Sequence, residues 1–258
     1  MPEGDTIHYA ANRMRPVLEG LVPRQIITPQ SRHLLDDWPR RLAGRAVSSV
    51  HAHGKHLFLR FEGGLTLRSH LRMSGAWALY SAGQRWRRPA SSAWLVIRHG
   101  GHEVVQFNGP VLELMRDSRE RFDQRLAALG QDILGVSFDE RRFLRALGEG
   151  EQDRTVGQAL LDQRTLAGIG NLWKAEACHG AGVDPRRAVS HAGERELLAI
   201  VGFAREHMAR SAREGMRERP RAVYGRQGMP CRRCGERIRA AREGEENRIT
   251  FWCPGCQH

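Results

Sequence analysis

Lysine is almost absent from this sequence, since Lys55 and Lys174 are the only lysines among 41 basic residues. Long apolar runs are missing too, so no segment is long enough to span a bilayer. The opening MPEGDTIHYA carries acidic side chains where a secretory signal needs basic ones, and no apolar stretch follows. These absences argue against a membrane protein and predict a cytoplasmic one, in which five cysteines favour metal ligation over disulfides.

Acidic residues are outnumbered, with 29 against 41 basic ones and a formal net charge of +12. This excess favours a polyanionic partner, because Lys and Arg gain affinity by displacing counterions condensed on phosphates. Nucleic acid is the expected partner, and a basic surface kept only for solubility is the alternative. In so arginine-rich a chain, Lys55 and Lys174 mark positions that favour a compact ammonium over a planar guanidinium, unless chance alone preserved them.

The apolar spacing predicts an α+β fold. Residues 5–19 have helical spacing, with Pro16 expected to kink or shorten the helix. Short strands follow up to about residue 110, and hairpins at 57–68 and 94–107 are typical of an antiparallel β-sandwich. Beyond about residue 120 the apolar period becomes helical, over residues 138–147, 156–161, 171–179 and 194–212.

Four of the five cysteines form two knuckles, Cys231-x2-Cys234 and Cys253-x2-Cys256, separated by eighteen residues. This spacing predicts a tetrahedral thiolate site for one zinc ion, held by a hairpin whose final strand is residues 249–252. All four ligand positions are taken, so the zinc would be structural, and it would supply roughly 10 kcal/mol of folding free energy or more. A redox pair or an iron site is the alternative. Cys178 is interpreted as a small core residue.

Residues 162–173 join two predicted helices through a glycine-containing turn, and the second helix starts near Asn171. Backbone N–H groups at such a helix start form an anion site, which predicts phosphate binding there. Asn171 either caps the helix or reaches the phosphate itself. A plain turn is the alternative.

The amino terminus is a third candidate. Trimming of Met1 exposes the secondary amine of Pro2 beside the carboxylate of Glu3. A terminal amine titrates near 8, about two units below an ordinary lysine, and so is the better nucleophile at neutral pH. The alternative is an exposed chain start without a role.

Several motifs occur in a fixed order along nearly the whole chain: residues 1–4 (MPEG), 53–57 (HGKHL), 69–75 (SHLRMSG), 162–173, 224–226 (YGR) and the four cysteines. Together they closely resemble the formamidopyrimidine-DNA glycosylase/endonuclease VIII family. The resemblance implies an N-terminal β-sandwich, a helical domain with a helix-two-turn-helix motif and a zinc ribbon, with DNA in the cleft between two lobes. We accordingly expect domains at residues 1–120, 121–222 and 223–258, with the arginine-rich stretch 214–226 as a linker.

The resemblance also implies catalytic roles. Pro2 would attack C1′ of the damaged nucleotide, expel the base and form a Schiff base with the opened sugar. Glu3 would give and take protons at the ribose. Lys55 would hold a backbone phosphate and act as the acid of β-elimination.

Three more residues are implied to contact DNA. Asn171 would bind a phosphate beside the lesion, and Arg248 would grip the flanking phosphate and assist δ-elimination. Met73 would fill the space left by the extruded base, which must leave the stack before C1′ can be attacked. For Met73 the alternative is ordinary core packing.

The sequence departs from the family pattern in three places. Asp5-Thr6 replaces the usual Pro-Glu, so a carboxylate expected near the sugar is missing or relocated. Residues 107–110 (FNGP) stand where the formamidopyrimidine branch has an Arg-Arg-Phe segment that reads the opposite base. The stretch before the ribbon is also too short for that branch's lesion-capping loop. These departures favour the endonuclease VIII branch and oxidised pyrimidines.

The expected function is therefore a bifunctional DNA glycosylase and abasic-site lyase of base excision repair that cleaves by β,δ-elimination. We expect a cytoplasmic, nucleoid-associated monomer that binds damaged DNA and one structural zinc, without an organic cofactor. The alternatives are a catalytically silent damaged-DNA-binding protein and an enzyme that acts mainly as an abasic-site lyase. The intact set of Pro2, Glu3 and Lys55 argues against the first, since binding alone needs no terminal secondary amine.

Overall fold

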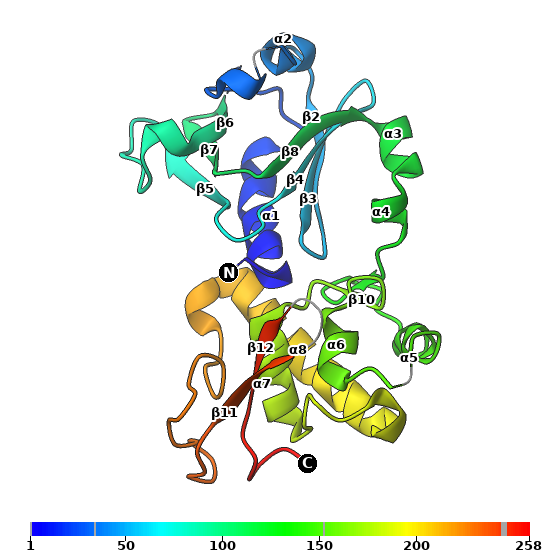
Figure 1. Cartoon of the computed structure of the whole chain (residues 1–258). Helices are drawn as coiled ribbons and strands as arrows, with labels where there is room; N and C mark the ends of the chain where they lie inside the picture. The colour runs from blue at the N-terminus through cyan, green and yellow to red at the C-terminus, as the bar shows by residue number, and fades with distance from the viewer. Residues whose placement is uncertain (1, 34, 152, 244–246) are drawn as a thin grey trace. The chain divides into compact units, whose positions relative to one another are not determined.

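The structure, a computed structural model, describes residues 2–33, 35–151, 153–243 and 247–258 (Figure 1). It divides into two units. The first holds Pro2 and residues 6–127, and the second holds residues 3–5 and 128–258. In the part of the chain that is described, no helix combines the length and the apolar character needed to cross a membrane.

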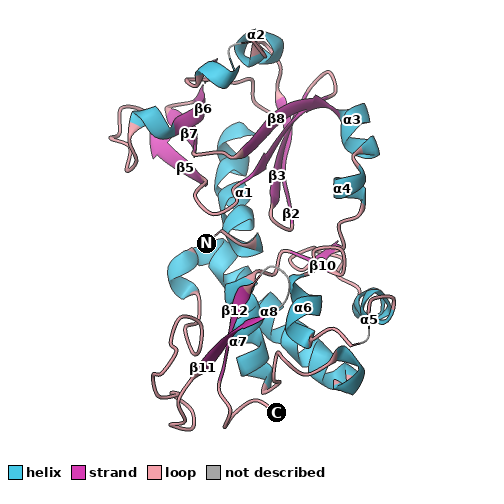
Figure 2. Ribbon diagram, in the orientation of Figure 1, coloured by secondary structure: helices cyan, strands magenta, loops and turns pink. Residues whose placement is uncertain are grey.

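Two four-stranded antiparallel sheets form the first unit (Figure 2). One has the order β2-β3-β4-β8 and the other the order β1-β6-β7-β5. The strands are β1 (Gln25–Ile27), β2 (Val47–His53), β3 (His56–Phe61), β4 (Leu65–His70), β5 (Ala76–Ser81), β6 (Ala93–His99), β7 (His102–Phe107) and β8 (Val111–Arg116). Both predicted hairpins are confirmed, as β3–β4 and β6–β7.

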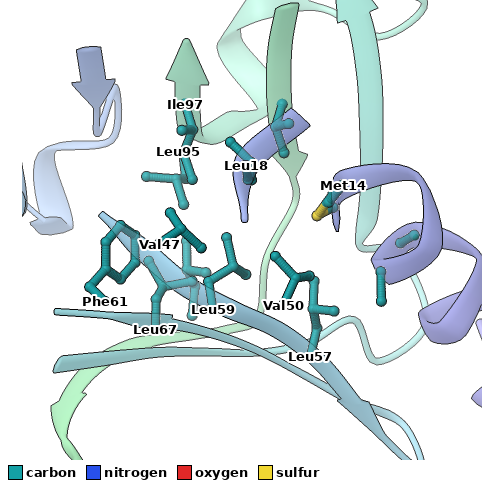
Figure 3. Close-up of a cluster of buried hydrophobic side chains, with 14 of the residues drawn as sticks. Met14, Leu18, Val47, Val50, Leu57, Leu59, Phe61, Leu67, Leu95 and Ile97 are labelled. Atoms are coloured by element: carbon teal, nitrogen blue, oxygen red, sulfur yellow. The ribbon is translucent and has the colours of Figure 1, made fainter. Parts of the chain in front are cut away.

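Side chains from both sheets meet in one core, into which the helix α1 (Gly4–Leu18) also packs (Figure 3). Met14 and Leu18 of α1 lie there with Leu59 of β3 and Leu95 of β6. The helix continues through Pro16 to Leu18, one residue before the end of the predicted range, so the shortening expected from the proline does not occur. Short helices complete this unit: η1 (Ser31–His33), α2 (Trp38–Leu42), η2 (Ala90–Ser92), α3 (Asp117–Phe122) and α4 (Gln124–Ala127).

The second unit is mostly helical, and its core lies where α7 packs against α6 and α8. Its elements are β9 (Gln131–Asp132), α5 (Glu140–Gly148), α6 (Val156–Leu161), β10 (Leu166–Ala167), α7 (Asn171–Ala181), η3 (Val189–His191), α8 (Glu194–Glu214) and η4 (Met216–Glu218). The four predicted helices are confirmed. The first begins later than predicted because Asp139 caps it, accepting hydrogen bonds from the backbone of Arg141 and Arg142.

The cysteine-rich end of the chain forms an antiparallel hairpin of β11 (Arg239–Glu243) and β12 (Arg248–Trp252), which confirms the predicted final strand. The interpretation of residues 214–226 as a linker is wrong. The Glu176 carboxylate accepts hydrogen bonds of 2.7, 3.0 and 2.8 Å from the backbone N–H groups of Ala222, Val223 and Tyr224. Val223 is fully buried, so this segment is part of the folded unit.

Candidate functional site

The carboxylate of Glu3 lies at the first turn of α7. Its oxygens accept hydrogen bonds from the backbone N–H groups of Gly170 at 2.9 Å, Leu172 at 2.9 Å and Trp173 at 3.3 Å. Glu3 is fully buried, and the N–H groups at a helix start stabilise its negative charge. The predicted anion site therefore exists, but its backbone donors hold Glu3 rather than standing open to a phosphate.

Two glycines make this close approach possible. A Cβ at Gly170 would lie 2.3 Å from Cδ of Glu3, and a Cβ at Gly4 would lie 2.9 Å from Cα of Gly168. The Gly4 N–H donates to the Gly168 carbonyl at 2.9 Å. Residues 3–4 are thus fixed against the turn that precedes α7, and Pro2 directly precedes them in the chain.

Asn171, the first residue of α7, connects this helix to the cysteine hairpin. Its Nδ2 donates to the carbonyl oxygen of Ile249 at 2.8 Å. An amide nitrogen carries two hydrogens, and this bond uses one of them. Ile249 directly follows Arg248, the first residue of β12, so Asn171 and Arg248 lie at the same end of that strand.

Tyr224 and Glu176 belong to the same region, and the sequence motifs gave neither a role. The Tyr224 ring packs against Phe251 of β12 at a centroid distance of 5.3 Å. Burial raises the pKa of the Tyr224 phenol, and the nearby Glu3 carboxylate raises it further. Glu176 holds the backbone around Tyr224. The sequence did contain one signal for Glu176, namely an acidic residue on the otherwise apolar α7.

At residues 5–6, where the sequence departs from the family pattern, the structure shows which groups the Asp5 carboxylate contacts. Its carboxylate accepts from Arg219 Nε at 2.7 Å and Nη2 at 2.6 Å, and from the Ser211 hydroxyl at 2.5 Å. Asp5 and Ser211 are fully buried. The carboxylate is therefore an internal ion-pair partner that ties the start of α1 to the end of α8.

In the first unit, Lys55 lies in the turn between β2 and β3, beside two histidines. His56 and His70 are directly opposite each other on β3 and β4, with ring centroids 4.8 Å apart. Burial, followed by neighbouring positive charge, lowers the pKa of His56 to about 3 and that of His70 to about 4. Lys55 is one of the cations that lower the pKa of His70. Both rings are neutral at neutral pH, and Lys55 is a cation beside them.

Met73 lies in the tight turn between β4 and β5, and its residue surface is 70% exposed. The turn is well fixed. Arg72 has a left-handed backbone with φ 47°, and its N–H donates to Nδ1 of His70 at 3.2 Å. Arg88 donates to the Ser74 carbonyl at 2.9 Å. The core-packing alternative for Met73 is therefore wrong, because a rigid turn presents this side chain to solvent.

The four cysteines of the two knuckles come together, and their sulfur atoms all lie within 4.8 Å of one another. The Cys231–Cys256 and Cys234–Cys253 sulfur separations are 3.9 and 3.4 Å. Tetrahedral zinc with bonds near 2.3 Å needs sulfur separations of about 3.8 Å, which this cluster fits. Cys178 is not part of the cluster and is fully buried in the helical core, as predicted.

The predicted site residues described above thus fall into two sets, one in each unit. Glu3, Asn171, Arg248 and the four cysteines lie in the second unit, and Lys55 and Met73 lie on adjacent turns of the first. An antiparallel β-sandwich, a helical unit and a four-cysteine hairpin define a glycosylase-like fold. Residues 1–119 match the profile of the formamidopyrimidine-DNA glycosylase N-terminal domain, and residues 129–219 match that of the formamidopyrimidine-DNA glycosylase H2TH domain.

Named relatives agree with these profiles. The chain is 39% identical to "Probable endonuclease 8 2" of Streptomyces coelicolor, over 100% of the chain and 94% of that protein. It is 35% identical to "DNA-(apurinic or apyrimidinic site) lyase Nei2" of Mycolicibacterium smegmatis, over 100% and 99%. The fold is shared with Lactococcus lactis Fpg solved with DNA containing an abasic site (TM-score 0.81, 20% identity, 99% of both chains). The chain belongs to the formamidopyrimidine-DNA glycosylase/endonuclease 8 family of DNA-repair enzymes.

Proposed function

We propose that this protein is a bifunctional DNA glycosylase and abasic-site lyase that excises oxidised bases, preferably pyrimidines, and cleaves the strand by β,δ-elimination. The observation that carries the proposal is the fixation of Glu3 by three backbone N–H groups at the start of α7, those of Gly170, Leu172 and Trp173. A buried carboxylate is thereby held in one place next to the residue whose terminal amine would react. Binding DNA without chemistry requires no such arrangement.

Pro2 is the nucleophile of the proposed reaction. Its secondary amine attacks C1′ of the damaged nucleotide, the bond from C1′ to the base breaks, and the base leaves with the electron pair and gains a proton. Glu3 takes the proton that the Pro2 nitrogen loses as its bond to C1′ forms, and gives that proton to O4′ as the sugar ring opens, which leaves an iminium ion between Pro2 and C1′. Loss of a C2′ proton then expels the 3′ phosphate, and a second elimination expels the 5′ phosphate.

Lys55 and Arg248 serve these eliminations. Lys55, a cation beside two neutral histidines, binds a backbone phosphate and acts as the acid of β-elimination. Arg248 binds the flanking phosphate through its planar guanidinium and assists δ-elimination. Asn171 adds a neutral hydrogen bond to a phosphate beside the lesion.

Met73 fills the gap in the stack when the damaged nucleotide is extruded. Extrusion is required because C1′ cannot be attacked in line while the base is stacked in a duplex. An exposed thioether on a rigid turn suits this role, since it brings apolar contact to whichever bases border the gap.

One zinc ion held by Cys231, Cys234, Cys253 and Cys256 completes the proposed enzyme. Four protein ligands leave no open position, so the ion would stabilise the hairpin that carries Arg248 and take no part in the reaction. No organic cofactor is needed, because the iminium ion formed between the terminal amine and C1′ accepts the electrons of the elimination. We further propose that the protein acts as a monomer on chromosomal DNA in the cytoplasm.

Abasic-site cleavage with weak base excision is a second candidate, favoured by the name of the Mycolicibacterium relative, a DNA-(apurinic or apyrimidinic site) lyase. A panel of oligonucleotides that each carry one defined lesion separates the two. Excision of an oxidised pyrimidine at a rate near that of abasic-site cleavage supports the glycosylase. Cleavage confined to the abasic substrate supports the lyase.

The covalent step gives the first prediction. The mature chain would have three amines, namely its Pro2 terminus, Lys55 and Lys174. Borohydride should trap a protein–DNA adduct on abasic DNA, and mass spectrometry should place the adduct on the peptide beginning with Pro2. Pro2→Gly should reduce trapping sharply, whereas Pro89→Gly, on a loop before η2, should not. Full trapping by protein with an acetylated terminus would refute the assignment.

A further inference from the structure

Lys174 is the lysine for which the proposed reaction has no role. It lies on α7 three residues after Asn171, and therefore on the same side of the helix. Its residue surface is only 1% exposed, an unusual position for a lysine. Its Nζ donates to the hydroxyl of Thr250 on β12 at 2.7 Å, and Thr250 is itself buried.

The surroundings of Lys174 are shaped for this side chain. A Cβ at Gly157 of α6 would lie 2.9 Å from the Pro185 carbonyl oxygen and 3.2 Å from Lys174 Cδ, so a glycine leaves room for both the backbone at Pro185 and the aliphatic stem of Lys174. Burial lowers the pKa of Lys174 to about 8; Cys178, Glu243 and Glu3 act to raise it, and Arg248 acts to lower it. The amine thus lies among the charged groups of the proposed phosphate site.

Two side chains of α7 hold two consecutive residues of β12. Asn171 donates to the Ile249 carbonyl, and Lys174 donates to the Thr250 hydroxyl. The residue just before this pair is Arg248. Lys174, Thr250 and Arg248, together with Glu243, line one cavity of about 790 Å³ in the second unit. The position of the Arg248 backbone therefore depends on how β12 is fixed to α7.

We propose that Lys174 is a positioning residue that fixes β12 against α7 through Thr250 and so sets where Arg248 meets the DNA phosphate. The proposal rests on the proposed function of Arg248 as a phosphate ligand. It also explains why a lysine stands here in a chain of arginines. A compact ammonium on a flexible stem fits beside Gly157, whereas the planar guanidinium is wider and demands more hydrogen-bond acceptors.

Binding to a duplex with a tetrahydrofuran abasic-site analogue, measured over a range of salt concentrations, tests the proposal. Arg248→Ala should lower the salt slope by roughly one unit. Lys174→Met, which keeps the stem, should weaken binding about tenfold and lower the slope similarly, because Arg248 is displaced. Thr250→Val should act in the same direction. The double variant Lys174→Met with Arg248→Ala should bind no worse than Arg248→Ala alone.

Hydrogen exchange on the DNA-free, metal-loaded protein gives a readout that does not depend on activity. Exchange at residues 249–252 should be faster in Lys174→Met and in Thr250→Val. Met208→Leu, a substitution of a fully buried side chain of the helical core on α8, is the matched control and should leave exchange there unchanged. If Lys174→Met does not fold, Thr250→Val decides the same question from the other side of the hydrogen bond.

Additive losses in the double variant, or unchanged exchange in β12, would overturn the positioning role. A failure of the proposed function of Arg248 would give a different combination of binding and exchange results. If Arg248→Ala binds DNA like the wild type, Arg248 is not a phosphate ligand, whereas faster exchange in Lys174→Met would still show that Lys174 holds β12.

Discussion

At the scale of single residues, the buried acidic groups near the chain start serve different purposes. Glu3 is held by backbone N–H groups, and Asp5 is held by Arg219 and Ser211. Both are fully buried, so each needs its partners to offset the cost of leaving water. Glu3 thereby remains a fixed carboxylate beside Pro2, and Asp5 holds residues 3–5 to the end of α8.

The Asp5 ion pair gives a stability prediction. Asp5→Asn leaves Arg219 buried without a counter-charge, so the free energy of unfolding should fall by about 3–5 kcal/mol. Urea denaturation measures this change. Asp37→Asn is the matched control, because the Asp37–Arg40 pair is exposed and should contribute less than about 1 kcal/mol. Equal small losses in both variants would show that the Asp5 pair adds no net stability.

At the scale of elements, the turn that carries Met73 is held by groups outside it. His70 accepts from Arg72, and Arg88 donates to Ser74. With a pKa of about 4 the His70 ring is neutral at neutral pH, and the hydrogen bond from the Arg72 N–H selects the tautomer that carries its hydrogen on Nε2 and leaves Nδ1 free to accept. The turn keeps its shape while the side chain at its tip is exposed.

Met73→Ala should slow excision of an oxidised pyrimidine from a duplex more than from a single strand. An unpaired strand has no partner base left in the stack, so the side chain has less to replace there. Single-turnover rates on matched paired and unpaired substrates measure the contrast. Met216→Ala is the control, because it removes the side chain of another exposed methionine, one that the proposed reaction does not use. Equal slowing on both substrates would count against a role in the stack.

The elements were largely predictable from the sequence, whereas their partners were not. Apolar periodicity located the hairpins and the helices, because burial of one face dictates that periodicity. The spacing of Cys231, Cys234, Cys253 and Cys256 predicted their cluster. The role of Glu176, the pairing of Asp5 with Arg219 and the hydrogen bond from Lys174 to Thr250 are contacts between residues 46 to 214 positions apart, on which local patterns carry no information.

At the scale of the whole molecule, the cysteine hairpin has little core of its own. Its buried apolar cluster consists of a few residues, among them Val223, Ile238 and Phe251, and two of the cysteines. A bound metal would therefore supply much of its stability. The order of β12, and with it the place of Arg248, should depend on that metal.

Metal removal gives the corresponding prediction. Elemental analysis should find one zinc per chain, and Cys253→Ser should lose the zinc together with most of the affinity for DNA. Cys178→Ala should keep both, since Cys178 lies in the helical core. A metal-free wild-type preparation that cleaves abasic DNA at the normal rate would rule out a structural zinc.

The burial of Lys174 has a practical consequence for handling the protein. Amine-reactive dyes, biotin esters and aldehyde resins need an accessible amine, and the chain has just two lysines. With Lys174 only 1% exposed, such reagents are left with Lys55 and the Pro2 terminus. Labelling through amines would therefore modify the groups on which the proposed chemistry depends. Fluorophores and surface linkers belong instead on a cysteine introduced at an exposed position of the sandwich, such as Ala82.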